Sequence, residues 1–281
     1  MKLYEVAGHR FAVSGEKVCG AVDSIPGFKP FEVKEGEPLF TFVEGECAPE
    51  MTSKQYDFIY EDVKGAFGKS ADGYVLSLKP ADEAPFWLWV NEGENLVQMC
   101  GNWSIRLYRF AMWLGLGIKL LPYGIVAIHS SCIVYNNKGV LFLGESGTGK
   151  STHTRLWRET IDGAVLLNDD SPFIRVDDGK VWAYGSPWSG KTPCYKAERY
   201  ELAGCVRLSQ APSNLIKRLS VLQSYGAIHP SCPPEFAYDS VLYDHVSAFL
   251  NGLLKAVPFY HLACLPNAEA AELSCRTIFP E

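Results

Sequence analysis

The nine cysteines of this chain include no C-x-x-C pair, and the sequence contains no run of lysine and arginine residues. A scattered, odd number of cysteines is typical of reduced thiols and argues against a disulfide framework or a zinc site. The net charge of −6 argues against a nucleic-acid-binding surface. We therefore expect a protein with reduced thiols and no nucleic-acid partner.

Long apolar runs are also missing. The one segment that resembles a membrane span, residues 103–123, contains Arg106, Arg109 and Lys119, so it falls short of the ~20 apolar residues that a span needs. The first six residues lack the apolar stretch of a signal peptide. We therefore expect a cytoplasmic protein without a membrane partner. The sequence leaves its oligomeric state open, with a homo-oligomer as one option.

Hydrophobic residues make up 47% of the 281 positions, which is enough for a sizeable buried core. Residues 1–122 are predicted to be β-rich, because short aromatic and β-branched runs at 38–43, 73–78 and 86–90 alternate with Gly, Pro and acidic turns. This spacing predicts an antiparallel β layer. Apolar residues at helical intervals then predict a helix over 103–121, which ends the region.

Residues 123–281 are predicted to form a second domain, of the α/β (α+β) class, with a mixed helical C-terminal part. Its first half alternates strands with a helix around a glycine-rich loop. The predicted strands are 125–135, 140–143, 164–167, 173–176, 181–184 and 258–264, and the predicted helices are 151–160, 213–224, 239–255 and 268–275.

The glycine-rich loop matches the phosphate-binding pattern G-x-x-x-x-G-K-[ST] without substitution. Its glycines let backbone N–H groups turn toward phosphate oxygens, Lys150 supplies charge for the β- and γ-phosphates, and the Ser151 hydroxyl is a ligand for Mg²⁺. The alternative is a glycine-rich turn without a ligand, but a strand before the loop and a helix after it favour the phosphate cradle. We predict that ATP or GTP binds here. The predicted nucleotide-binding residues are Gly144, Glu145, Ser146, Gly147, Thr148, Gly149, Lys150, Ser151 and Thr152.

Asp169 and Asp170 end the predicted strand that follows the loop helix. One carboxylate at this place can hold Mg²⁺, and the second can accept a proton from a hydroxyl group. The alternative is an Asx turn at the end of the strand, because Asn and Asp favour turns. The loop upstream favours the functional interpretation. No N-K-x-D guanine motif follows, so the pattern is not that of a typical GTPase.

Two further features stand close to this motif in the sequence. Alternation along the predicted strand 125–135 places His129 on one face with Ala127 and Ser131. Residues 185–192 are predicted to form a Gly/Pro-bracketed loop that closes over the phosphates or the acceptor, with Lys191 neutralising charge. A structural turn with Trp188 packed inward is equally compatible with that loop.

Together these pieces resemble the HPr kinase/phosphorylase family, within the larger group that includes phosphoenolpyruvate carboxykinase. The resemblance covers residues 124–195. It rests on the loop sequence at 144–151, on a histidine fifteen residues before its first glycine, and on the Asp-Asp pair after its helix. The loop at 185–191 is similar to a divergent branch of HPr-kinase-like proteins. The first 120 residues do not resemble the N-terminal domain of HPr kinases.

The resemblance implies a role for each matching residue. Asp170 would be the proton acceptor, Asp169 would support the metal or the substrate, and His129 would contact the phosphate and acceptor network. The implied activity is an ATP-dependent kinase whose acceptor is a hydroxyl, expected to be a serine, of a peptide, a protein or a small molecule.

Two other function classes remain open. One is a nucleotide-binding regulatory or scaffold protein without transfer activity. The other is a carboxykinase-type enzyme, which would need further metal ligands and basic groups that the sequence does not identify. The intact pair of acids favours an enzyme over a sensor.

Overall fold

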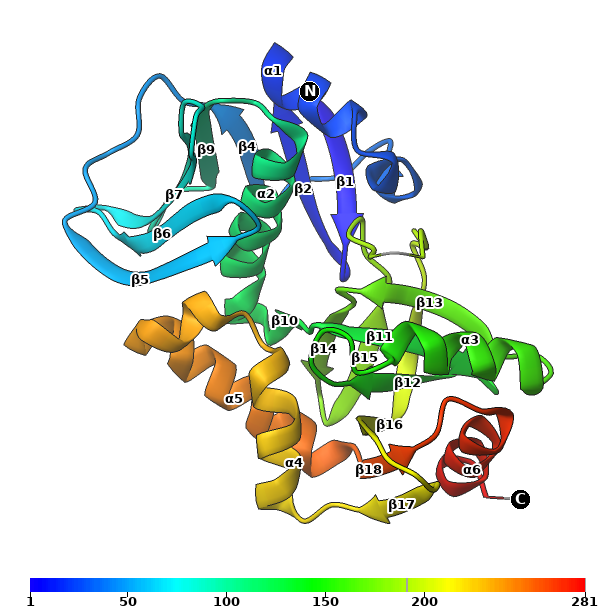
Figure 1. The fold of residues 1–281 in the computed structure, drawn as a ribbon. Coiled ribbons are helices and arrows are strands. Elements are labelled where there is room, and N and C mark those ends of the chain that lie inside the picture. The colour runs from blue at the N-terminus through cyan, green and yellow to red at the C-terminus, as the bar shows by residue number, and fades with distance from the viewer. Residues whose placement is uncertain (191, 281) are drawn as a thin grey trace. The chain divides into compact units, whose positions relative to one another are not determined.

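The computed structural model describes residues 1–190 and 192–280, and it has a mixed α/β fold with large sheets and helices. Figure 1 shows the chain as a ribbon. The chain divides into two compact units. The first comprises Met1–Pro122 and Glu235–Tyr243, and the second comprises Tyr123–Pro234 and the residues from Asp244 onward.

The first unit contains one large sheet with the strand order β3-β1-β2-β4-β9-β8-β7-β6-β5. Its strands are β1 Lys2–Val6, β2 His9–Ser14, β3 Glu32–Val33, β4 Phe40–Glu44, β5 Ser53–Tyr60, β6 Val63–Lys69, β7 Gly73–Pro80, β8 Phe86–Asn91 and β9 Leu96–Gly101. The predicted antiparallel layer is correct for most neighbours but wrong for β4, which pairs in parallel with both β2 and β9. The reason is the crossover through α1 (Glu16–Asp23), which returns the chain in the direction of β2.

The predicted helix over 103–121 is confirmed as α2 (Ile105–Leu120), followed by a short turn at Leu121–Tyr123. Within the first unit, the buried carboxylate of Asp239 binds the segment 235–243 to the strands of the sheet. This carboxylate pairs with Lys69 at 2.9 Å and accepts hydrogen bonds at 3.0 Å from the Tyr74 hydroxyl and from the first N–H groups of α5 (Ser240–Ala256).

The second unit is built on a sheet with the order β10-β14-β15-β16-β12-β11-β13, to which β18 adds beside β16, and β17 beside β18. Its strands are β10 Ile125–Ala127, β11 Ser130–Tyr135, β12 Lys138–Leu143, β13 Val165–Asp170, β14 Phe173–Asp177, β15 Lys180–Tyr184, β16 Arg199–Gln210, β17 Leu215–Arg218 and β18 Phe259–Cys264. β12, β16 and β18 run parallel to one another, while the other pairs are antiparallel.

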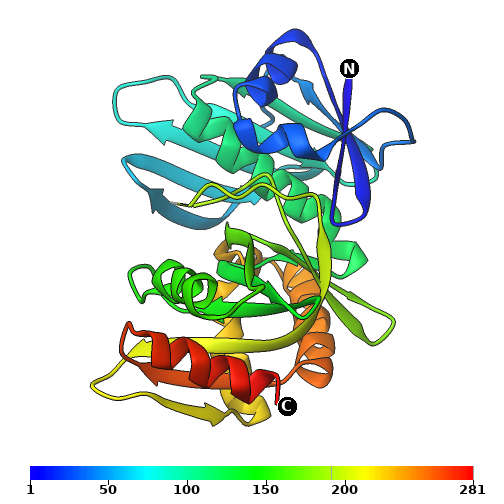
Figure 2. The ribbon, with the colours of Figure 1, turned by 90° about the vertical axis from the view of Figure 1, so that its right-hand side faces the viewer.

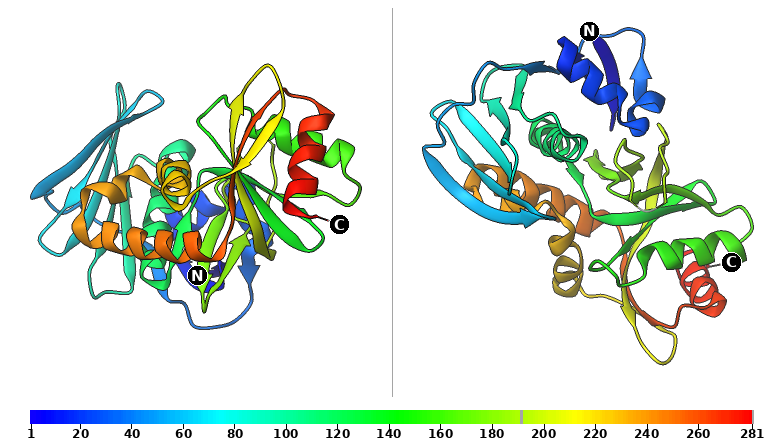
Figure 3. Two further views of the ribbon diagram at one scale, coloured as in Figure 1. Left: turned by 90° about the horizontal axis from the view of Figure 1, so that it is seen from below. Right: turned by 45° about the horizontal axis from the view of Figure 1, so that its top comes forward.

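Two helices, α3 (Lys150–Thr160) and α6 (Ala268–Ile278), pack together on one face of this sheet (Figure 2). Apolar side chains of the strands meet Trp157 of α3 and Ala271 of α6 there in a buried core. The helix α4 (Val221–Ile228) and the second half of α5 lie on the opposite face (Figure 3). This layering holds the end of β12 and the start of α3 in fixed positions.

Several predicted elements of the second unit need correction. The strand predicted over 125–135 is two strands, because Ile128 and His129 donate their N–H groups to Pro172 and Ser231, outside the sheet ladder. The helix predicted over 213–224 is instead β17 followed by α4. Ser220 begins α4 with a capping box closed by Gln223. The long strand β16 was not predicted. The helix at 239–255 and the strand at 258–264 are confirmed as α5 and β18.

Candidate active site

The glycine-rich loop connects the end of β12 to the first residue of α3, as its sequence requires. Gly147 and Gly149 have φ angles of 82° and 109°, in the left-handed region that glycine adopts without strain. Gly149 caps α3 without a side-chain hydrogen bond, so the first N–H groups of the helix have no side-chain acceptor in the described structure. A helix start of this kind attracts anions.

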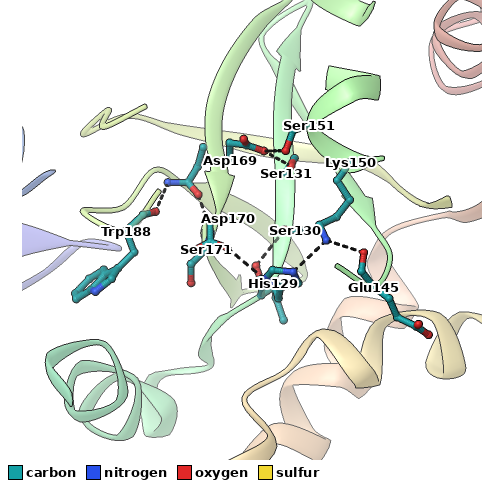
Figure 4. A network of polar contacts seen from close by, with 12 residues as sticks. His129, Ser130, Ser131, Glu145, Lys150, Ser151, Asp169, Asp170, Ser171 and Trp188 are labelled. Atoms are coloured by element: carbon teal, nitrogen blue, oxygen red, sulfur yellow. Dashed lines mark hydrogen bonds and ion pairs between the residues drawn. The ribbon is translucent and has the colours of Figure 1, made fainter. Parts of the chain in front are cut away.

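Lys150 is the first residue of α3, and its side chain turns back over the loop. Its Nζ donates to the carbonyl oxygens of Gly144 at 2.8 Å and Glu145 at 3.3 Å, and it lies 3.0 Å from Nε2 of His129 (Figure 4). The residue is only 9% exposed. Burial lowers the pKa of Lys150, and the carboxylates of Asp170 and Asp169 oppose that effect. These carboxylates favour the charged form of the amine at the mouth of the loop.

Asp169 lies at the end of β13 beside the next residue of the loop helix. Its Oδ1 accepts hydrogen bonds from the hydroxyls of Ser151, at 3.0 Å, and Ser131, at 2.5 Å (Figure 4). The cross-strand pairing of Ser131 with Asp169 brings the second of these groups into place. Oδ2 of Asp169 is buried and has no hydrogen-bond partner in the described part of the chain. A buried carboxylate oxygen that is left over in this way is suited to a cation or to an ordered water.

Asp170 is the other acid of the pair, and it faces His129. The distance from its Oδ1 to Nδ1 of His129 is 3.4 Å, and both side chains are partly exposed, at 37% and 51%. His129 therefore lies between Asp170 and Lys150, with one ring nitrogen near each. The expectation that strand alternation orients His129 is wrong, since the residue lies in the break between β10 and β11. Its position comes instead from its own N–H bond to Ser231, at 2.8 Å.

The loop after β15 is tied to the same strand end by Asn168. The Asn168 amide donates to the Trp188 carbonyl at 2.9 Å and to the Ser186 hydroxyl at 3.2 Å. Trp188 is 4% exposed and packs inward against Phe173, so this tryptophan is a structural residue. Lys191, predicted to neutralise phosphate charge, lies outside the described residues.

Close approach of this loop to the acid pair depends on a glycine. The Gly190 N–H donates to the Asp169 carbonyl at 2.6 Å, and a Cβ at this position would come within 2.8 Å of the same oxygen. Asp170 and Ser189 form an isolated β-bridge next to it. The loop therefore supports the backbone of both acids.

Two further residues of the predicted nucleotide site, Thr148 and Thr152, lie in the loop and in the first turn of α3. Thr148 donates both its N–H and its hydroxyl to the Glu145 carbonyl, which closes a tight turn around Ser146. Thr152 lines a cavity of about 530 Å³ on the α3 side of the loop. The structure thus gathers the predicted residues that it describes at one edge of the sheet. Their roles in binding remain predictions.

Two residues at this edge were not predicted from the sequence. Ser131 meets Asp169 only because β11 and β13 pair in register. Arg207 lies on β16 opposite Leu143, the last residue before the loop. Neither has a motif around it. Finding them requires the strand order of the sheet, which no local pattern gives.

No group of three or more His, Cys, Asp or Glu residues among 1–190 and 192–280 is arranged to hold a metal ion. No helix in the described part of the chain has both the length and the apolar character needed to cross a membrane.

No protein-family model matches the chain, and no curated protein matches it. The chain is similar to the solved structure of the HPr(Ser) kinase/phosphatase from Coxiella burnetii, with 12% sequence identity and a TM-score of 0.30. The likeness covers 53% of this chain and 90% of that one.

Proposed function

We propose that this chain is a Mg²⁺-dependent kinase that transfers the γ-phosphoryl group of ATP or GTP to a hydroxyl group. The expected acceptor is a serine of a peptide or protein, or a hydroxyl of a small molecule. The observation that carries the proposal is the convergence of Lys150, His129 and Asp170 at the mouth of a loop with the phosphate-binding sequence. Phosphoryl transfer needs a phosphate cradle and a group that takes the acceptor proton, and these side chains supply both.

The loop and Lys150 would bind the triphosphate. The uncapped N–H groups of α3 and the Lys150 amine would donate to phosphate oxygens. The amine now meets two backbone carbonyls, which are neutral partners that a phosphate can replace. Binding therefore exchanges contacts in which only the amine is charged for contacts in which both partners are charged.

The oxygen atoms of Asp169 and Ser151 are suitable ligands for Mg²⁺. This cation prefers oxygen ligands and is held in nucleotide sites by one or two protein groups together with phosphates and water. Asp169 has a buried oxygen that no residue among 1–190 and 192–280 partners, and the Ser151 hydroxyl lies beside its other oxygen. Bound by these two residues, Mg²⁺ would neutralise charge on the phosphate oxygens. A cluster of three protein ligands is not needed for such a site.

Asp170 would act as the proton acceptor. Its carboxylate is partly exposed, so a hydroxyl group can reach it, and Nδ1 of His129 lies 3.4 Å from its Oδ1. In the transfer, the acceptor oxygen forms a bond to the γ-phosphorus while the bond to the β–γ bridging oxygen breaks. The hydroxyl proton passes to the Asp170 carboxylate, and the nucleoside diphosphate leaves. His129 would hold Asp170 and Lys150 in position.

The proposal is tested by following labelled γ-phosphate from ATP with Mg²⁺ into a library of serine-containing peptides. Transfer by the wild type that is absent in Lys150→Ala supports a kinase. Tight nucleotide binding without transfer to the library or to the identified physiological partner would instead identify a nucleotide-binding regulator.

A further inference from the structure

Arg207 is a cation beside the glycine-rich loop that no motif indicates. It belongs to β16, which runs parallel to β12, and it pairs in register with Leu143. Because parallel strands end at the same edge of a sheet, the pairing brings Arg207 next to the point where the loop begins. The alternation along β16 directs Val206 and Leu208 into the core under α3, so Arg207 faces the side of α4.

The contacts of Arg207 are weak for a guanidinium group. Its Nη2 lies 3.6 Å from a carboxylate oxygen of Glu145, and its Nη1 donates to the Ala227 carbonyl at 3.4 Å. The Glu145 side chain is 86% exposed, whereas that of Arg207 is 26% exposed. A long ion pair with an exposed carboxylate contributes little. The guanidinium is therefore held near the loop by a partner that is easily displaced.

Glu145 is the common partner of two cations. Its backbone carbonyl accepts from the Lys150 amine, and its carboxylate faces Arg207. The two like charges therefore repel each other across a single loop residue. An anion bound at the loop would relieve their repulsion.

A cavity of about 550 Å³ opens on this side of the loop. Its lining includes Glu145, Thr148, Arg207, Ser209, Gln223 and His261. The volume lies within the range of small-molecule sites. The cavity meets the loop at Glu145 and Thr148, and Arg207 lies in its wall. A phosphate at the loop can therefore reach the guanidinium without crossing the core.

We propose that Arg207 is a second phosphate-binding cation of the nucleotide site. Its guanidinium leaves Glu145 and binds a phosphate oxygen of the nucleoside triphosphate, while the Glu145 carboxylate turns to solvent. The planar fork of arginine suits phosphate oxygens and gives charge-assisted bonds that a pair at 3.6 Å does not. Glu145 then competes with the phosphates for Arg207. This inference rests on the proposed function, because it needs a triphosphate at the loop.

The test measures the affinity of the whole chain for Mg-ATP and for Mg-tripolyphosphate by calorimetry at low salt. Arg207→Met removes the charge and keeps most of the stem. A matched control is Lys138→Met, because Lys138 pairs with Glu201 at 3.7 Å between the same two strands, at their other end. We expect Arg207→Met to weaken both ligands about tenfold or more, since bonds to charged groups are strong. Lys138→Met should leave both affinities unchanged.

Two further variants test the role of Arg207 even if Arg207→Met does not fold. Arg207→Lys retains the charge without the fork and should lose less affinity than Arg207→Met. Glu145→Gln removes the competing carboxylate and should strengthen tripolyphosphate binding about threefold or more. Thermal melting followed by circular dichroism establishes that each variant is folded.

Each result bears on a different claim. Wild-type affinity in both Arg207→Met and Glu145→Gln would overturn the role of Arg207, while the loop would still bind nucleotide. If Arg207→Met lost affinity for Mg-ATP but bound Mg-tripolyphosphate like the wild type, Arg207 would contact the nucleoside. That result would also overturn its role as a phosphate-binding residue. A wild type that binds neither ligand would overturn the proposed function itself.

Discussion

Ser131→Ala removes one of the two hydroxyl groups that hold Asp169. In the native chain the Ser131 hydroxyl donates to Oδ1 at 2.5 Å, and Ser151 donates to the same oxygen at 3.0 Å. Asp169 itself is 3% exposed, so water cannot freely replace the lost donor. After the substitution, Ser151 is the one remaining side-chain donor to this carboxylate among the residues that the structure describes. The residue proposed to bind Mg²⁺ then loses its fixed orientation.

The size of the effect follows from this geometry. A hydrogen bond to a charged group contributes about 1.5–3 kcal/mol to stability. Loss of a group that orients a metal ligand typically lowers metal affinity about 10–100-fold. We therefore expect Ser131→Ala to be less stable by about 1.5–3 kcal/mol. We also expect half-maximal nucleotide binding to require about 10–100-fold more Mg²⁺.

The assay titrates Mg²⁺ at fixed ATP and follows nucleotide binding, while urea unfolding gives the free energy of unfolding. Ser130→Ala is the matched control, because the Ser130 hydroxyl is equally buried but donates to the Ile128 carbonyl at 3.1 Å. It should be destabilised by about 0.5–1.5 kcal/mol without a change in Mg²⁺ dependence. An unchanged Mg²⁺ requirement in Ser131→Ala would refute the role given to Asp169.

Two further substitutions test other parts of the structure. Lys150→Ala should abolish Mg-nucleotide binding measured by calorimetry while the melting temperature stays close to that of the wild type, and unchanged affinity would contradict the phosphate cradle. Glu235→Gln tests a buried carboxyl of the first unit whose pKa burial raises from 4.5 to about 7. The folded state then keeps a proton that the unfolded chain releases, so the wild type loses stability as pH rises from 4.5 to 7, by about 3 kcal/mol in all. Since glutamine cannot ionise, the free energy of unfolding of the variant, measured with urea, should rise relative to that of the wild type as pH increases over this range. A difference between the two that does not change with pH would show that Glu235 is not buried as described.

Local sequence determines the elements that carry the phosphate-binding motif. The end of β12, the loop and the start of α3 follow from a short apolar run, a glycine pattern and a helical run, all within about twenty residues. The positions of Lys150 and Ser151 could therefore be predicted. The two acids could be placed at a strand end for the same reason. These features depend on neighbours in the sequence.

Features that depend on strand order could not be predicted in this way. His129 is not in a strand because the chain changes partners there, from β14 to β12 and β13. Ser131 reaches Asp169 through the register of an antiparallel pair. Arg207 reaches the loop through the parallel pairing of β16 with β12, and β16 was not predicted as a strand. Tertiary pairing determines all three.

The central claim is that Asp170 takes the proton of an acceptor hydroxyl during phosphoryl transfer. The most direct measurement compares the rate of labelled γ-phosphate transfer in the wild type and in Asp170→Asn, together with their affinities for Mg-ATP. A positioned general base contributes about 10²–10⁴-fold to the rate. We expect Asp170→Asn to lose about that much rate while its nucleotide affinity stays near that of the wild type. Transfer at the wild-type rate in Asp170→Asn would contradict the assignment.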